Sequence, residues 1–211
     1  SNLEPRYSCL MFITLEGPEG AGKTTLIRGL AERLMAEGRA VVTTREPGAG
    51  PVGGLIREIL LGDNEIHPRA ELLLFLADRA QHVEDLIRPA LDGGQVVLCD
   101  RHADSTVVYQ GYGRGLDRDE LRRMNAHATG GLVPDLTLLL DIDPELGLQR
   151  QERADRLGGE GLEFHQRVRE GFLSEAKREP SRWVILNAQE PAPQVEERAW
   201  KVIAERLRAK A

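Results

Sequence analysis

The fold of this chain is decided by the stretch Phe12-Ile13-Thr14-Leu15-Glu16-Gly17-Pro18-Glu19-Gly20-Ala21-Gly22-Lys23-Thr24-Thr25-Leu26-Ile27. It contains the pattern Gly-x-x-x-x-Gly-Lys-Thr, which begins at Gly17 and is typical of a phosphate-binding P-loop. A β-rich run over 12–15 precedes the pattern, and apolar residues at helical spacing follow it up to Leu34. Strand, glycine-rich turn and helix in this order predict a site for a nucleoside triphosphate.

Each part of the pattern has a chemical reason. Gly17, Gly20 and Gly22 can adopt backbone angles that side chains forbid, so the loop can wrap closely around an anion. The N–H groups of the loop and of the helix N-terminus then point at that anion. Lys23 brings a positive charge to the β- and γ-phosphates, and the Thr24 hydroxyl serves Mg²⁺. The predicted ATP-binding residues are Gly17, Pro18, Glu19, Gly20, Ala21, Gly22, Lys23, Thr24 and Thr25.

Composition narrows the possible partners. The 211 residues carry 28 basic and 34 acidic side chains, a net charge of −6. An acidic chain has no overall attraction for nucleic acid or for an anionic membrane, so we expect neither as a partner. Two cysteines give no disulfide framework, which fits a cytoplasmic protein. Residues 1–10 lack the apolar core of a signal peptide, and we interpret them as an added leader before a native start at Met11.

The order of the remaining segments predicts the fold class. Apolar runs that read as strands alternate with helical patterns along the whole chain, which is typical of an α/β sheet with helices on both faces. We expect a three-layer P-loop NTPase fold with a five-stranded, mostly parallel sheet, in one domain over 11–211. The predicted strands are 12–15, 40–44, 95–99, 136–141 and 183–186. The predicted helices are 23–37, 55–61, 68–86, 105–110, 117–128, 144–153, 162–177 and 193–208, with an irregular segment at 48–54.

A P-loop leaves the reaction open. A GTPase switch usually carries an Asn-Lys-x-Asp string, which does not occur here, and the sequence is silent on the partner surfaces of a motor ATPase. A small-molecule kinase needs a second pocket and a lid that excludes water. Phe75 and Arg79, four residues apart, put a ring and a hydrogen-bond donor on one helix face. Arg57 and Arg101 are candidates for an anion clamp, and the arginine-rich segment 150–163 for a lid.

Several strings in one order make the chain, from Met11 to its end, resemble bacterial thymidylate kinases. They are Glu16-Gly17-Pro18-Glu19-Gly20-Ala21-Gly22-Lys23-Thr24-Thr25, Thr44-Arg45-Glu46-Pro47-Gly48, Leu74-Phe75-Leu76-Ala77-Asp78-Arg79-Ala80-Gln81-His82, Asp100-Arg101-His102-Ala103-Asp104-Ser105, Tyr109-Gln110-Gly111, Arg153-Ala154-Asp155-Arg156 and Phe164-His165-Gln166-Arg167-Val168-Arg169. The resemblance implies transfer of the γ-phosphoryl of ATP to dTMP with Mg²⁺, an arginine-rich lid and a homodimer.

The resemblance also implies a role for each matching residue. The implied catalytic residues are Lys23, Arg101, Arg153, Arg156 and Glu19. Phe75 would stack on thymine, Arg79 would donate to a thymine carbonyl, and Tyr109 would lie near the sugar 2′ carbon. The other substrate-binding residues would be Arg57 and Arg101 at the acceptor phosphate, with Ser105, Thr106 and Gln110 along the sugar and base. Thr24 and Asp100 would serve the metal.

The chain also departs from the family. Gly48-Ala49-Gly50-Pro51 differs from the usual Glu-Pro-Gly-Gly context, His102 stands where an aromatic ring is frequent, and Gly158 replaces a lid acid. The alternative is another P-loop deoxynucleotide or deoxynucleoside kinase, in which Glu19 would act as a base. A nucleotide-dependent switch without acceptor turnover is the non-enzymatic alternative.

Overall fold

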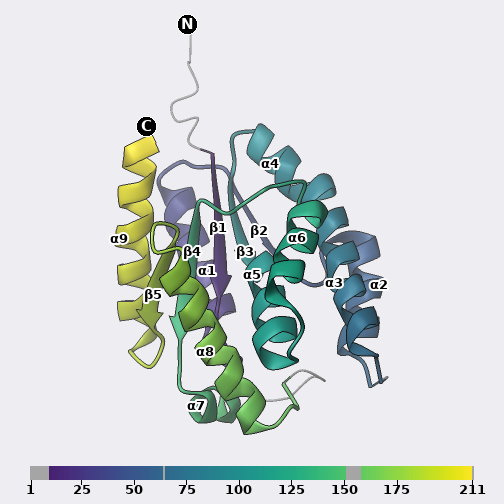
Figure 1. Cartoon of the computed structure of the whole chain (residues 1–211). Helices are drawn as coiled ribbons and strands as arrows, with labels where there is room; N and C mark the ends of the chain where they lie inside the picture. Colours follow the sequence, from purple (N-terminus) through teal and green to yellow (C-terminus); the bar gives the residue numbers. More distant parts are fainter. Residues whose placement is uncertain (1–9, 64, 151–157, 211) are drawn as a thin grey trace, which may run out of the picture.

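The structure is a computed structural model, and it describes residues 10–63, 65–150 and 158–210. Five strands form one sheet: β1 (Met11–Glu16), β2 (Val41–Arg45), β3 (Val96–Asp100), β4 (Leu136–Asp141) and β5 (Trp183–Asn187). Their order is β2-β3-β1-β4-β5, and every pairing is parallel (Figure 1). The expected α/β class and five-stranded sheet are confirmed.

Strand β1 lies at the centre of the sheet, and all six of its residues are buried. Thr14 pairs with Cys99 of β3 on one side and with Thr137 of β4 on the other. The two threonine hydroxyls satisfy each other at 2.9 Å. A strand covered on both faces carries an apolar run without alternation, which explains the sequences of β1, β3 and β4.

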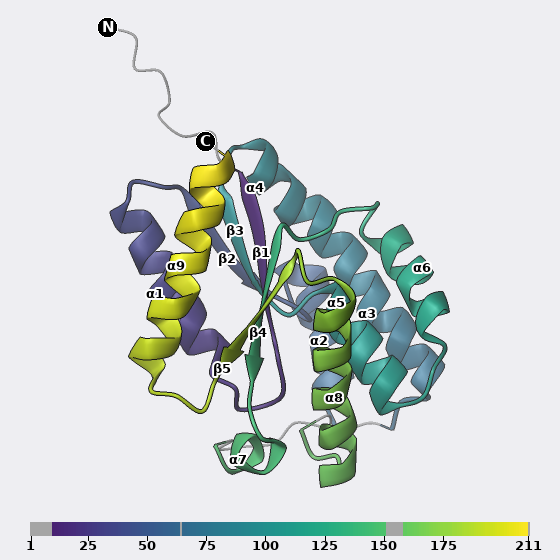
Figure 2. The same ribbon diagram turned by 60° about the vertical axis from the view of Figure 1, so that its left-hand side comes forward.

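Helices cover both faces of the sheet (Figure 2). On one face, α1 (Lys23–Ala36) and α9 (Ala192–Lys210) pack over β1, β3 and β4. The opposite face is covered by α3 (Pro68–His82) with its extensions η1 (Val83–Ile87) and α4 (Arg88–Asp92), by α5 (Ala103–Thr106) with η2 (Val107–Gly113), and by α8 (Leu162–Arg178). Three outer helices complete the described part of the chain: α2 (Gly50–Leu61) against α3, α6 (Arg118–Ala128) against α3 and η2, and α7 (Pro144–Gln149) against α8.

Local sequence explains where several helices begin. Asp117 and Asp143 cap α6 and α7, because their carboxylates accept from the backbone N–H groups of Glu120 and Glu145. Pro68 opens α3 at a position where a missing N–H costs nothing. Among the described residues, no helix is both long and apolar enough to cross a membrane.

The prediction of an irregular segment over 48–54 is wrong for residues 50–54, because α2 already begins at Gly50. One glycine of this helix, Gly53, is required for packing. A Cβ on Gly53 would lie 2.6 Å from Oδ1 of Asp78, so glycine allows α2 to approach α3 closely. The predicted helix 144–153 ends at Gln149, with Arg150 as its cap, and residues 151–157 lie outside the described part. The leader assigned to 1–10 falls almost wholly outside it too and stays a prediction.

Candidate active site

A cavity of about 640 Å³ opens at the carboxyl ends of β1, β2 and β3. This is the edge at which open parallel sheets bind ligands. The P-loop forms one side of the cavity, and α2, α3, α5 and η2 contribute the other. Predicted site residues that line it are Glu19, Gly20, Ala21, Gly22, Lys23, Thr24, Thr25, Arg57, Phe75, Arg79, Asp100, Arg101, Ser105, Thr106, Tyr109 and Gln110. Gly17 and Pro18 are not among the lining residues, but their carbonyls accept hydrogen bonds from Lys23, and the Gly17 carbonyl also accepts from Arg101.

The P-loop backbone follows the predicted geometry. Gly20 and Gly22 have φ angles of 67° and 89°, in the left-handed region that favours glycine. A Cβ on Gly20 would lie 2.0 Å from the carbonyl oxygen of Gly147 in α7, so the loop also needs glycine for space. Lys23 Nζ donates to the carbonyls of Gly17 and Pro18 at 3.1 and 2.9 Å. Burial, followed by the charge of Arg101, lowers the pKa of Lys23.

Thr24 and Asp100 meet at the end of the P-loop. The Thr24 hydroxyl donates to Oδ2 of Asp100 at 3.1 Å, which brings two oxygen ligands together from α1 and β3. Mg²⁺ prefers oxygen and commonly takes only one or two protein groups, with water and substrate phosphate completing its shell. The two predicted metal residues therefore fit Mg²⁺. The described residues contain no cluster of three or more His, Cys, Asp or Glu side chains suited to a metal.

Arg101 connects the P-loop to the acceptor side of the cavity. Its guanidinium donates to the Gly17 carbonyl at 2.9 Å and to Oε1 of Glu19 at 2.7 Å. The Tyr109 hydroxyl donates to the same Glu19 oxygen at 2.9 Å, and the Tyr109 ring centre lies 5.0 Å from Cζ of Arg101. Burial alone would raise the pKa of Glu19, but the charges of Arg101 and Lys23 lower it to about 2. Glu19 is therefore ionised at neutral pH and has little affinity for a proton.

The backbone of Arg101 is strained. Its φ is 67°, and it is the only non-glycine residue with a positive φ in the ranges that the structure describes. The Arg101 N–H donates to the Leu15 carbonyl at 3.0 Å, and the next N–H, of His102, donates to Oε1 of Glu16 at 2.8 Å. Ser105 holds the other Glu16 oxygen at 2.6 Å. Burial and the nearby Asp104 raise the pKa of Glu16 to about 7.

The predicted base-binding residues lie together on the far side of the cavity. Phe75 is only 9% exposed and lines the cavity wall. Arg79 is 1% exposed, and its Nη1 donates to Thr106 at 2.9 Å. The Gln110 amide donates to Oε1 of Glu71 at 2.9 Å, a carboxylate that Arg114 also holds at 2.8 Å. These contacts fix the orientation of each polar group before any ligand arrives.

One arginine of the predicted anion clamp and one of the predicted lid donate to backbone carbonyls. Arg57 lines the cavity, and its Nη1 donates to the Pro47 carbonyl at 2.7 Å. Arg150, at the beginning of the predicted lid, donates to the Ala188 carbonyl at 3.1 Å. Arg153 and Arg156 lie outside the described residues, so their predicted roles stay predictions.

Sequence reasoning missed the residues that hold the binding groups in place. Their shared property is that they contact other side chains rather than the open cavity: Glu16, Glu71, His82, Arg114 and Asn125. Glu16, His82 and also Glu46 stand in the quoted strings, but the sequence assigns them no role. For Glu46, only its place two residues after the predicted strand 40–44 indicates a position near the site.

Known proteins provide an independent comparison. The family model described as thymidylate kinase matches residues 15–199. A thymidylate kinase of Synechococcus sp. (strain JA-2-3B'a(2-13)) is 55% identical over 197 residues, which cover 93% of this chain and 96% of that one. A thymidylate kinase of Deinococcus radiodurans is 53% identical over 200 residues, with 93% and 97% covered. A crystal structure of thymidylate kinase from Ehrlichia chaffeensis superposes with a TM-score of 0.79 at 33% identity, covering 92% of this chain and 98% of that chain. The chain therefore belongs to the thymidylate kinase family and is a nucleoside-monophosphate kinase that phosphorylates dTMP.

Proposed function

We propose that this kinase transfers the γ-phosphoryl group of ATP to the phosphate of dTMP, forming dTDP and ADP, with Mg²⁺ as cofactor. The observation that carries the proposal is one cavity lined by both a P-loop and a second cationic group, Arg57 and Arg101. A nucleoside triphosphate and a phosphorylated acceptor can therefore occupy the same cavity with their phosphates facing each other.

The acceptor phosphate needs no base. The second pKa of a phosphate monoester is about 6, so the attacking oxygen is already largely deprotonated at neutral pH. A deoxynucleoside kinase would need a base for a sugar hydroxyl, and Glu19 is the candidate carboxylate. Its pKa of about 2 makes it a poor base, which favours a phosphate acceptor over a hydroxyl.

Catalysis then consists of positioning and of neutralising charge. Lys23 would contact the β- and γ-phosphates, and Arg101 would bridge towards the acceptor phosphate from beside Gly17. Arg153 and Arg156 are proposed to add positive charge from the lid. Thr24 and Asp100 would hold Mg²⁺, which supplies charge neutralisation at the phosphate oxygens when bound.

The same proposal assigns the base and sugar contacts. Phe75 stacks on thymine, Arg79 donates to a thymine carbonyl, and Thr106 and Gln110 line the base and sugar beside Ser105. Tyr109, held by Glu19, stands near the 2′ carbon and disfavours a ribose hydroxyl. These base- and sugar-binding side chains come from α3, α5 and η2, and α5 packs against both of the others.

The test is ADP release with ATP and Mg²⁺ in the presence of dTMP, dUMP, thymidine or no acceptor. We expect strong stimulation by dTMP and none by thymidine. Turnover of thymidine would move the assignment to a nucleoside kinase, and ATP hydrolysis without any acceptor effect would favour a nucleotide switch.

The surface of α2 and α3 supports a homodimer as the working state. Val52, Leu55 and Ile59 lie on one face of α2 and are 46–64% exposed, and Leu73 of the adjacent α3 is 57% exposed. An apolar face of this kind is typical of a protein–protein contact. Leu55→Glu should convert a dimer to a monomer in sedimentation experiments, and a wild-type monomer at micromolar concentration would contradict the proposal.

We propose a cytoplasmic location, where ATP and a free Cys99 thiol are both expected.

A further inference from the structure

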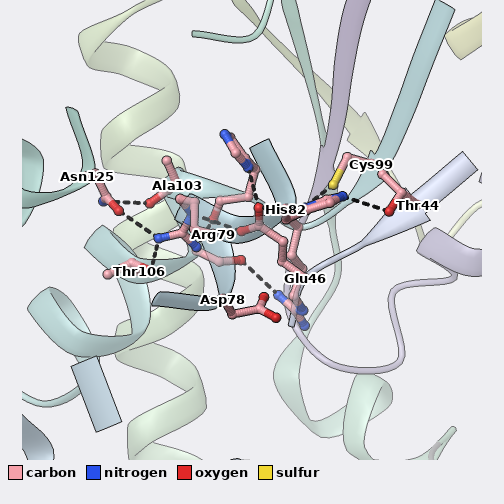
Figure 3. A network of polar contacts seen from close by, with 12 residues as sticks. Thr44, Glu46, Asp78, Arg79, His82, Cys99, Ala103, Thr106 and Asn125 are labelled. Carbon is pink, nitrogen blue, oxygen red and sulfur yellow. Dashed lines mark hydrogen bonds and ion pairs between the residues drawn. The ribbon is translucent and has the colours of Figure 1, made fainter. Parts of the chain in front are cut away.

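Four ionisable side chains meet in the protein interior beneath the acceptor side of the cavity. Glu46 follows β2, Arg79 and His82 belong to α3, and His102 follows β3. All four are buried, with exposures of 4%, 1%, 1% and 0%. Figure 3 shows Glu46 between Arg79 and His82, with Thr106 and Asn125 on the other side of the guanidinium. Charged groups in such a place must be paired, so their contacts define a fixed arrangement.

Arg79 is held by contacts on both ends of its guanidinium. Nε donates to Oε2 of Glu46 at 2.8 Å, and Nη1 donates to Thr106 and to Asn125 at 2.9 and 2.7 Å. Nη2 donates to the His102 carbonyl at 3.1 Å. A guanidinium has five N–H donors, and the described residues occupy four of them. One N–H on Nη2 remains for a ligand in the cavity that Arg79 lines.

Glu46 is the centre of the cluster. Its second oxygen, Oε1, lies 2.9 Å from Nδ1 of His82 and 2.8 Å from Nδ1 of His102. Burial alone would raise the pKa of Glu46, but the Arg79 charge and the His102 contact hold it well below its usual value. The carboxylate is thus ionised and can only accept, which requires a proton on Nδ1 of both imidazoles. Nε2 of His82 can then accept from the Thr44 hydroxyl at 2.8 Å.

His102 has a different surrounding. Its ring packs edge-on against Phe12 with centroids 5.1 Å apart, and its Nε2 has no partner among the described residues. The ring therefore contributes one polar contact, the Nδ1–H bond to Glu46. The backbone of His102 contributes three more, because its N–H donates to Glu16 and its carbonyl accepts from Arg79 and from the Ser105 N–H at 3.1 Å. His102 also directly follows Arg101, the strained residue of the site.

We propose that His102 is a positioning residue for recognition of the acceptor base: its Nδ1–H fixes Glu46 and its carbonyl fixes Nη2 of Arg79, so that the remaining Arg79 N–H faces a carbonyl of the base. His102 lines the cavity together with Glu46 and Arg79, and its proposed effect on the base is exerted through Arg79. The inference rests on the proposed role of Arg79 towards thymine. A ring without a nitrogen donor could fill the space beside Phe12, but it would leave Glu46 with one donor fewer.

The test compares amide side chains that differ in where they put their donor. His102→Asn places an amide N–H near the position of Nδ1, whereas His102→Gln places it near the position of Nε2. His102→Phe keeps a flat ring and removes both nitrogens. His127→Phe, on the exposed end of α6, is the matched control for the change from His to Phe.

Steady-state kinetics with dTMP, dCMP and ATP give the readout. At position 4 cytosine presents an amino donor where thymine presents a carbonyl acceptor, so the ratio of kcat/KM for dTMP to that for dCMP reports a contact of Arg79 with the 4-carbonyl, the carbonyl meant in the proposal. We expect His102→Phe and His102→Gln to raise the KM for dTMP about tenfold and to lower the dTMP/dCMP ratio similarly, which is about 1.4 kcal/mol for one positioned hydrogen bond. The KM for ATP should stay within about twofold. His102→Asn should stay within about threefold of wild type in all three values.

Two results would overturn the positioning role of His102. Equal effects of Asn and Gln, or equal rises in the KM values for dTMP and ATP, would show a role in stability alone and overturn the proposal. Where the Phe variant does not fold, as judged by thermal unfolding, the comparison of Asn with Gln still decides. Absence of dTMP turnover in the wild type would instead overturn the proposed function, and it is measured first.

Discussion

The two sides of the cavity are built differently. On the donor side Gly22, Thr24 and Thr25 are exposed, and the P-loop offers mainly backbone groups and one lysine. On the acceptor side the polar groups rest on carboxylates that are at most 4% exposed, Glu46 and Glu71. A triphosphate brings its own charge and needs only complementary donors, whereas a base is distinguished by the exact direction of single hydrogen bonds. The acceptor side therefore has its donors fixed in advance, which lowers the cost of ordering them on binding.

The largest effect should come from the donor side. Lys23→Ala removes the charge that we propose contacts the β- and γ-phosphates, so we expect kcat to fall by roughly 10²–10³-fold or more. Thermal unfolding should change little, because the hydrogen bonds of Lys23 to described residues go to two carbonyls of the P-loop itself. Lys201→Ala on the exposed face of α9 is the control. A near-normal kcat would remove Lys23 from the mechanism and weaken the contrast between the two sides.

A smaller and more selective effect should come from the acceptor side. Phe75→Ala should raise the KM for dTMP roughly ten- to hundredfold, the usual value of one ring stacked on a base. The KM for ATP should remain within about twofold, because Phe75 belongs to α3, which lines another side of the cavity than the P-loop does. Since Phe75 also packs on Leu60, Phe75→Leu is the companion variant that keeps most of the apolar volume. Equal rises for dTMP and ATP would contradict a base platform.

The free energy of unfolding should depend on pH through Glu16, the last residue of β1. Glu16 has its pKa raised from 4.5 to about 7 in the folded chain, so the folded state binds the extra proton between these values. This contribution to stability is fully present below pH 4.5 and is lost as pH rises through 7. Between pH 5 and pH 7.5 it amounts to about 2 kcal/mol.

Glu16→Gln keeps an acceptor for the His102 N–H and a polar partner for Ser105, but it cannot ionise. The free energy of unfolding of this variant, measured by denaturant titration, should fall less steeply between pH 5 and pH 7.5 than that of the wild type. Parallel pH profiles would mean that Glu16 ionises as it does in an unfolded chain.

The smallest effect should come from a pair that belongs to neither side. Arg33 of α1 and Glu197 of α9 form a 2.9 Å ion pair with side chains 33% and 48% exposed. Glu197→Gln should change the free energy of unfolding by less than about 1 kcal/mol, and the difference should shrink at high salt. A larger loss would mean that this exposed ion pair stabilises the fold more than exposed ion pairs usually do.

Much of the fold and of the cavity could be predicted because the relevant patterns lie within short stretches of the sequence. The P-loop string, the apolar runs of β1 and β4, and the spacing of Phe75 and Arg79 are all visible in the sequence. The supporting residues are not, since Asn125 reaches Arg79 across 46 positions and Glu46 reaches His102 across 56. Such contacts depend on how α3, α6 and the sheet pack. The start of α2 was missed because glycines at 50, 53 and 54 suggest an irregular backbone, whereas Gly53 is needed for packing against Asp78.

The contact between the P-loop and α7 limits which residues this chain can accept at two positions. Gly20 and Gly147 meet backbone to backbone, and a Cβ on Gly147 would lie 2.4 Å from the Glu19 carbonyl oxygen. Every other amino acid carries a Cβ, and no change in the neighbouring side chain can remove a backbone atom. A substitution at either position therefore requires the backbone of the P-loop or of α7 to shift, and no change in a neighbouring side chain can compensate for it.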